Sequence, residues 1–161
     1  MEQKMQGAHA MKGGHYSRLL AMVVLSFIAM FGLMYAMVNT FDNVFINLNQ
    51  FYMAGLMVAP MVIIELMLMW NMYPNKKVNG LIMAASAVAL LLFWILIRQQ
   101  AAISDRQFLK SMIPHHAGAI LMCEKTRVHD PRIQQLCRDI LSSQQAEIAL
   151  MKSLLAKSGE K

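Results

Sequence analysis

The chain has 161 residues, of which 57% are hydrophobic, and its mean hydropathy is +0.42. This composition is too apolar for an ordinary soluble domain of this size. Lys and Arg outnumber Asp and Glu by 15 to 9, but no basic patch with interleaved aromatics accompanies the excess, so nucleic acid is not an expected partner. The 2 cysteines are too few for a disulfide scaffold, whereas 17 methionines are several times the usual content.

Three apolar segments are long enough to cross a bilayer. They cover residues 19–38, 51–70 and 81–97. The polar, Gly-rich start of the chain predicts a flexible tail. We therefore divide the chain into a flexible cytoplasmic tail at 1–18, a three-helix transmembrane region at 19–98 and a C-terminal domain at 99–161.

The distribution of basic residues predicts the orientation in the membrane. Lys4, Lys12 and Arg18 precede the first span, and Lys76 and Lys77 lie between the second and the third. The 39–50 loop has no basic residue, and basic loops stay in the cytoplasm. We expect a multi-pass protein of the bacterial inner membrane, with a cytoplasmic N-terminus and the domain after residue 98 in the periplasm.

Sulfur and one carboxylate lie inside the predicted spans. Met30, Met34 and Met37 share a face of the first span, and Met53, Met57 and Met61 share a face of the second. These faces either line a path for Cu(I) or serve as adaptable packing surfaces, and the sequence leaves both interpretations open. Glu65 is a functional candidate as an intramembrane carboxylate, although it lies close enough to the span end to reach the headgroups.

Metal donors concentrate in residues 112–123. A helix turns by about 100° per residue, so five donor side chains fall on one stripe about 120° wide. They are Met112, His115, His116, Met122 and Cys123. Thioether, thiolate and imidazole together favour copper, above all Cu(I), over hard cations. The alternative is a buried helix face on which Met and Cys fill space.

Two helices are predicted in the C-terminal domain. Ser104 and Gln107 form a capping box before a helix that runs to about residue 128, with Pro114 as a kink or local break. Asp130 is the expected N-cap, and Pro131 the first residue, of a second helix that ends near Lys157. Its expected inward stripe consists of Ile133, Cys137, Ile140, Leu141, Gln144, Ile148, Met151 and Leu155, with Glu147 at the edge.

A turn near residue 130 makes these helices antiparallel, so residues whose numbers sum to about 260 should lie level. The expected metal ligands are Met112, His115, His116, Met122 and Met151. Gln144 and Glu147 would orient the imidazoles or specify the helix pairing. Cys123 and Cys137 should approach each other, either as a disulfide or as thiols that add ligands.

The C-terminal domain resembles the bacterial family called domain of unknown function 305. The resemblance rests on Asp105-x-x-Phe108-x-x-x-Met112-Ile113-x-His115-His116-x-x-Ala119-Ile120-x-Met122 and on Ile140-x-x-x-Gln144-x-x-Glu147-Ile148-x-x-Met151. Residues 49–57 look like the membrane-anchored members. The resemblance implies a ferritin-like helical fold, periplasmic copper binding and copper tolerance. Because this chain has one His-His motif and not two, a complete four-helix bundle would need a second chain.

We therefore expect an all-α protein in which three transmembrane helices precede a periplasmic antiparallel hairpin, half of a ferritin-like bundle. Its expected role is non-enzymatic Cu(I) binding for copper buffering, delivery or tolerance. The expected partners are the lipid bilayer, a second copy and copper-handling proteins. The alternative is an interaction module with structural histidines. A metal oxidase is disfavoured because di-iron sites use Glu-x-x-His pairs, which neither Glu124 nor Glu147 forms.

Overall fold

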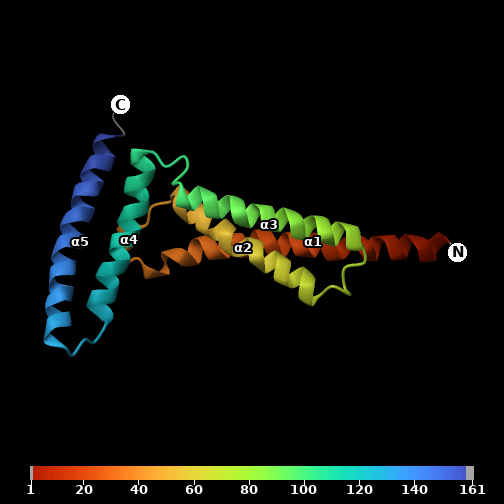
Figure 1. Ribbon diagram of the computed structural model, residues 1–161, viewed down its shortest axis with the longest axis horizontal. Helices are drawn as coiled ribbons and strands as arrows, with labels where there is room; N and C mark the ends of the chain where they lie inside the picture. Colours follow the sequence, from red (N-terminus) through yellow and green to blue (C-terminus); the bar gives the residue numbers. More distant parts are fainter. Residues whose placement is uncertain (1, 159–161) are drawn as a thin grey trace. The chain divides into compact units, whose positions relative to one another are not determined.

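The computed structural model describes residues 2–158, with side chains from residue 14 onward, and shows helices and no β-strand among them. The α-helices are α1 (Glu2–Leu33), α2 (Leu48–Leu68), α3 (Lys76–Arg98), α4 (Asp105–Lys125) and α5 (Pro131–Lys157) (Figure 1). Two short 3-10 helices, η1 (Met34–Met37) and η2 (Phe41–Asn43), lie between α1 and α2. The all-α prediction is confirmed.

The chain folds as two compact units, described separately below. The first comprises Met1–Gly32 and Phe51–Ala101, and the second comprises Leu33–Gln50 and Ala102–Lys161. Among the described residues, three segments are long and apolar enough to cross a membrane. They are Gly14–Met37, Leu48–Leu68 and Lys76–Arg98, and each overlaps one predicted span.

Helix α1 begins at Glu2, within the segment predicted to be a flexible tail, and continues without a break into the first apolar segment. Once an apolar span has nucleated a helix, each added residue gains a hydrogen bond at little further cost. The Gln, Lys, Met and Ala residues of this segment are good helix formers, which accounts for the extension.

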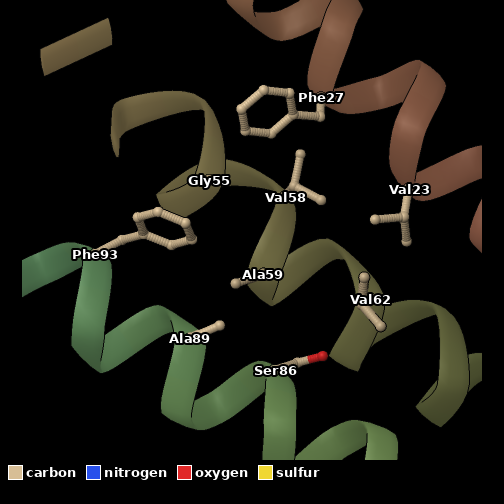
Figure 2. Close-up of a pocket in the computed structure, with 9 residues that line it drawn as sticks. All are labelled: Val23, Phe27, Gly55, Val58, Ala59, Val62, Ser86, Ala89 and Phe93. Carbon is tan, nitrogen blue, oxygen red and sulfur yellow. The ribbon is translucent and has the colours of Figure 1, made fainter. Parts of the chain in front are cut away.

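The first unit, called the membrane-type unit below, has an apolar cavity of about 220 Å³ between α1, α2 and α3. Figure 2 shows Val23 and Phe27 from α1, four residues of α2, and Ser86, Ala89 and Phe93 from α3 around it. The ring of Phe93 lies against Gly55 of α2, where an added Cβ would come within 2.4 Å of the ring. No methionine is among the described residues that line this cavity.

The methionine face predicted on the second span therefore does not face this cavity. Met53 and Met57 are exposed on the surface of the isolated unit, and Met61 packs partly against the apolar cluster around Val58 and Val62. Lipid or packing contacts account for these side chains better than a sulfur-lined path between the helices.

The predicted hairpin caps are present in part. Ser104 accepts a hydrogen bond from the Gln107 backbone N–H, and Asp130 accepts one from the Arg132 backbone N–H ahead of Pro131. The capping box is not reciprocal, however, because the Gln107 side chain accepts instead from the Leu48 backbone N–H, 3.1 Å away. The first helix ends at Lys125, three residues before the predicted end, since Thr126 is extended.

Of the two outcomes predicted for Pro114, the local break is absent, because α4 is continuous from Asp105 to Lys125. Proline has no N–H to donate to the carbonyl four residues before it, and at Pro114 this leaves the carbonyl of Lys110. The side chain of Asn47 replaces that donor, with Nδ2 donating to the Lys110 oxygen at 3.4 Å. The Asn49 amide likewise donates to the Ser111 hydroxyl at 3.3 Å.

The second unit, called the hairpin unit below because it contains α4 and α5, therefore also includes the 33–50 segment. The predicted C-terminal domain at 99–161 did not include this segment, because the sequence analysis treated 39–50 only as a polar loop. Tyr35 donates to the carbonyl of Phe45 at 2.8 Å, which closes the segment on itself. Val38 and Phe45 then pack on the apolar cluster of the hairpin.

Asn47 should contribute more to stability than an ordinary loop residue. It is almost fully buried, and its Oδ1 also accepts from the Gln50 N–H at the start of α2. We expect Asn47→Ala to lower the free energy of unfolding by about 1–2 kcal/mol, measured by thermal unfolding in detergent followed by circular dichroism. Asn47→Asp should recover part of this loss because it keeps the acceptor.

A double-mutant cycle separates the two hydrogen bonds of Asn47: the one it donates to the Lys110 carbonyl of α4 and the one it accepts from the Gln50 N–H. In a Pro114→Ala background the alanine supplies the missing N–H to Lys110, so Asn47→Ala should cost less there than in the original chain. The same cost in both backgrounds would contradict the compensation of Pro114 by Asn47.

Candidate metal site on the helical hairpin

Helices α4 and α5 lie side by side and are joined by a short turn (Figure 1). Their shared core contains Ile113, Ala117 and Ile120 from α4 against Ile148 and Met151 from α5. Burial of this apolar surface stabilises the pair, at roughly 25 cal/mol per Å². The core therefore fixes which edge of each helix remains accessible.

The predicted inward stripe of α5 is largely correct. Seven of its eight members are buried or partly buried, and Ile133 is the exception at 47% exposed. Residue 127 would lie level with Ile133, and α4 has already ended at Lys125. The first turn of α5 consequently has no facing helix.

The donor stripe of α4 lies at the edge of the helix interface. Met112, His116 and Cys123 are partly buried, whereas His115 and Met122 are exposed. Ile113 takes the centre of the interface, about 100° round the helix from Met112. The five donors are thus brought to one side of the hairpin without forming its core.

His116 is the donor held most firmly. Its Nδ1 lies 3.0 Å from Glu147 Oε2 of α5, and its side chain is 12% exposed while that of Glu147 is 49% exposed. The contact is close but not aligned with the ring N–H, so it is an electrostatic contact and not a well-formed hydrogen bond. Glu147 thus contacts His116 as the register predicts, and Gln144 is partly buried on the same stripe.

The two histidines are neighbours, with ring centroids 6.0 Å apart and planes tilted by 60°. Among the described residues, no three His, Cys, Asp or Glu side chains are grouped closely enough to hold a metal ion. A metal on this edge would therefore need thioether sulfur as well. Met112 is partly buried against the hairpin core, and Met151 is buried within that core at 8% exposed.

Sequence reasoning missed the part played by the 33–50 segment near these donors. Gly118, two residues after His116, lies beside η1, where an added Cβ would be 3.6 Å from the Met37 carbonyl oxygen. The sequence does show a proline next to the His-His pair and an Asn-rich loop at 39–50. Nothing in a single sequence, however, indicated that an asparagine of this loop donates to the carbonyl that Pro114 leaves without a helical donor.

The two cysteines approach each other, as the register predicts. Both are thiols and partly buried in the structure. Hydrogen bonding with the Cys137 thiol, followed by burial and the charge of Cys137, raises the pKa of Cys123 to about 11. The pair therefore lies level at the turn end of the hairpin, and whether it is bridged in cells remains a prediction.

Alkylation kinetics test this contact. With its pKa near 11, Cys123 is almost wholly protonated at pH 8 and should react slowly, since the thiolate is the nucleophile. Cys137→Ala removes the largest cause of the shift, so the rate at Cys123 should rise at least about tenfold at pH 8, measured by peptide mass spectrometry. Ser142→Ala, an exposed change on α5, is the control. An unchanged rate in Cys137→Ala would contradict the thiol contact.

Comparison with known proteins identifies the family. The family described as Domain of unknown function (DUF305) matches residues 76–155, which include α3 as well as the hairpin. The chain is also 39% identical, over 142 residues, to "Uncharacterized protein L153" of Acanthamoeba polyphaga mimivirus, and the match covers 86% of this chain and 91% of that protein. No solved structure matches significantly. On these matches, the chain belongs to the DUF305 family.

Proposed function

We propose that this chain is a membrane-anchored Cu(I)-binding protein that buffers or delivers copper, and so supports copper tolerance. The observation that carries the proposal is the placement of His116 on the edge of the hairpin, with its Nδ1 against Glu147 and the thioether residues Met112 and Met151 in the adjacent apolar cluster. Copper is the cargo in this proposal and no reaction is assigned.

The contact with Glu147 supports a ligand role for His116. A carboxylate beside one imidazole nitrogen restricts the orientation of the ring. Glu147 Oε2 lies 3.0 Å from Nδ1, which leaves Nε2 to bind a metal. Thioethers add soft donors that match Cu(I) and contribute little to a Zn(II) site, so the donor set fits monovalent copper.

The exposed members of the stripe favour a site shared between two chains. His115 and Met122 are exposed, and large apolar side chains are exposed on the same hairpin. They are Phe108, Met122, Leu136, Leu150 and Leu154. A second copy packed on this surface would complete a four-helix, ferritin-like bundle and remove these side chains from water. Copper-handling proteins would compete for the same surface.

The proposed location is the bacterial inner membrane, with the N-terminus in the cytoplasm and the hairpin in the periplasm. Three helices of sufficient length and apolarity support the anchoring. The orientation rests on Lys76 and Lys77 at the start of α3 and on the absence of basic residues in the 39–50 loop.

Copper binding is tested with the full chain in detergent, because the 33–50 segment packs on the hairpin and an isolated 100–161 fragment would lack it. The protein should bind Cu(I) more tightly than Zn(II) in competition with a chromogenic chelator. His116→Ala should weaken Cu(I) binding at least about tenfold, and Glu147→Gln by a smaller factor, about tenfold or less.

The control is His129→Ala. His129 is exposed in the turn between α4 and α5, so its loss should leave affinity unchanged. Equal losses from His116→Ala and His129→Ala would contradict the proposed site. Retained oligomerisation without copper binding would favour an interaction module instead.

Topology is tested with reporter fusions. A fusion after residue 75 should give a cytoplasmic signal, and one after residue 161 should give a periplasmic signal, because basic loops are retained inside. A cytoplasmic signal from the second fusion would overturn the proposed orientation.

A further inference from the structure

A second cavity lies in the membrane-type unit, where α1 faces the end of α2 and the turn that follows it. Its volume is about 230 Å³, and unlike the cavity in Figure 2 it is lined by sulfur and titratable groups. The donor side chains around it are His15, Met22, Glu65, Met69 and Met72. None of them belongs to the hairpin.

Helical spacing explains why these side chains meet. His15 and Met22 are seven residues apart on α1, with the buried Leu19 between them. Glu65 and Met69 are four residues apart at the end of α2, and the helical hydrogen bond from the Met69 N–H to the Glu65 carbonyl is 2.9 Å long. Residues at these intervals share one helix face, so two donor faces converge on the cavity.

A buried polar framework fixes the carboxylate. Tyr73 is buried, and its hydroxyl donates to Glu65 Oε1 at 3.4 Å. Asn79 is fully buried, donates to the Tyr73 carbonyl at 3.2 Å, and accepts from the Tyr16 hydroxyl at 2.7 Å. The Tyr16 and Tyr73 rings pack with centroids 5.5 Å apart. Asn79 and Tyr16 thus hold Tyr73, which in turn contacts Glu65.

The histidine is placed by the same framework. The His15 ring meets the Tyr73 ring edge to face, with centroids 6.3 Å apart. Met22 and Met69 are partly buried against the apolar cluster of the unit, and Met72 is 48% exposed. The cavity therefore has a rim of packed side chains and one exposed methionine, Met72, at which a metal can enter.

We propose that this cavity is a second Cu(I) site, with His15, Met22, Met69 and Met72 as donors and Glu65 as the compensating negative charge. Three thioethers and one imidazole are a soft donor set suited to Cu(I). A single carboxylate is too little for Mg²⁺ or Ca²⁺, which take mainly oxygen ligands, and it disfavours an anion. Arg18 also lines the cavity, but it is exposed and its charge is screened by solvent.

The choice of metal follows the proposed function, but none of the residues of the hairpin site is used. With the orientation proposed above, this site lies at the cytoplasmic end of the spans. The chain would then present soft donors on both sides of the membrane, one set on the hairpin and one beside the turn between α2 and α3.

The test compares Cu(I) stoichiometry in the full chain, kept reduced and in detergent, for a matched pair of double variants. Met69→Leu/Met72→Leu removes two thioethers from the cavity with little change in volume. Met57→Leu/Met67→Leu removes two exposed thioethers of α2 that do not line the cavity. The first variant should lose about one copper equivalent, and the second should lose none.

Combining each pair with His116→Ala distinguishes this inference from the proposed function. If the hairpin site fails, His116→Ala has no effect, while Met69→Leu/Met72→Leu still removes its equivalent. If the cavity binds no copper, the two double variants give the same stoichiometry in either background, which overturns the inference. Copper K-edge absorption should also show fewer sulfur neighbours in Met69→Leu/Met72→Leu than in the control. Equal sulfur scattering in the two would equally overturn it.

Discussion

The missing N–H of Pro114 is the constraint on which the hairpin unit depends. It leaves the Lys110 carbonyl without its helical donor, and Asn47 supplies one from the 33–50 segment. The same Asn47 side chain accepts from the Gln50 N–H at the start of α2, and Gln107 accepts from the Leu48 N–H. The side chains of Asn47 and Gln107 therefore join the 33–50 segment, the start of α2 and α4 through partly buried hydrogen bonds.

This arrangement determines where the donors of α4 lie. Helix α5 covers the side of Ile113, Ala117 and Ile120, and the 33–50 segment covers the side of Pro114 and Gly118. The remaining edge carries the His-His pair and the sulfurs, half covered and half open. The proposed copper site uses this edge, on which His115 and Met122 are exposed.

The membrane-type unit uses polar groups in a different way. Its cavity between α1, α2 and α3 is lined almost entirely by carbon, yet Asn79, Tyr16 and Tyr73 form a buried hydrogen-bonded framework at one end. Buried polar groups of this kind are retained only when their partners are present. Here they fix the turn between α2 and α3 and hold Glu65 beside His15 and the methionines, so the polar end of the unit is also its chemically distinctive end.

The sequence alone determined the features that depend on local periodicity. Apolar length predicted the three spans, caps at Ser104 and Asp130 predicted the starts of α4 and α5, and the antiparallel register predicted the contacts of Glu147 with His116 and of Cys123 with Cys137. Only the tertiary structure decided that the 33–50 segment belongs to the hairpin, that Ile113 and not Met112 faces α5, and that His15 and Glu65 line one cavity. Local spacing gives the relative angles of side chains on one helix, but the rotation of that helix and the partner of an unpaired carbonyl are set by contacts between residues far apart in the chain.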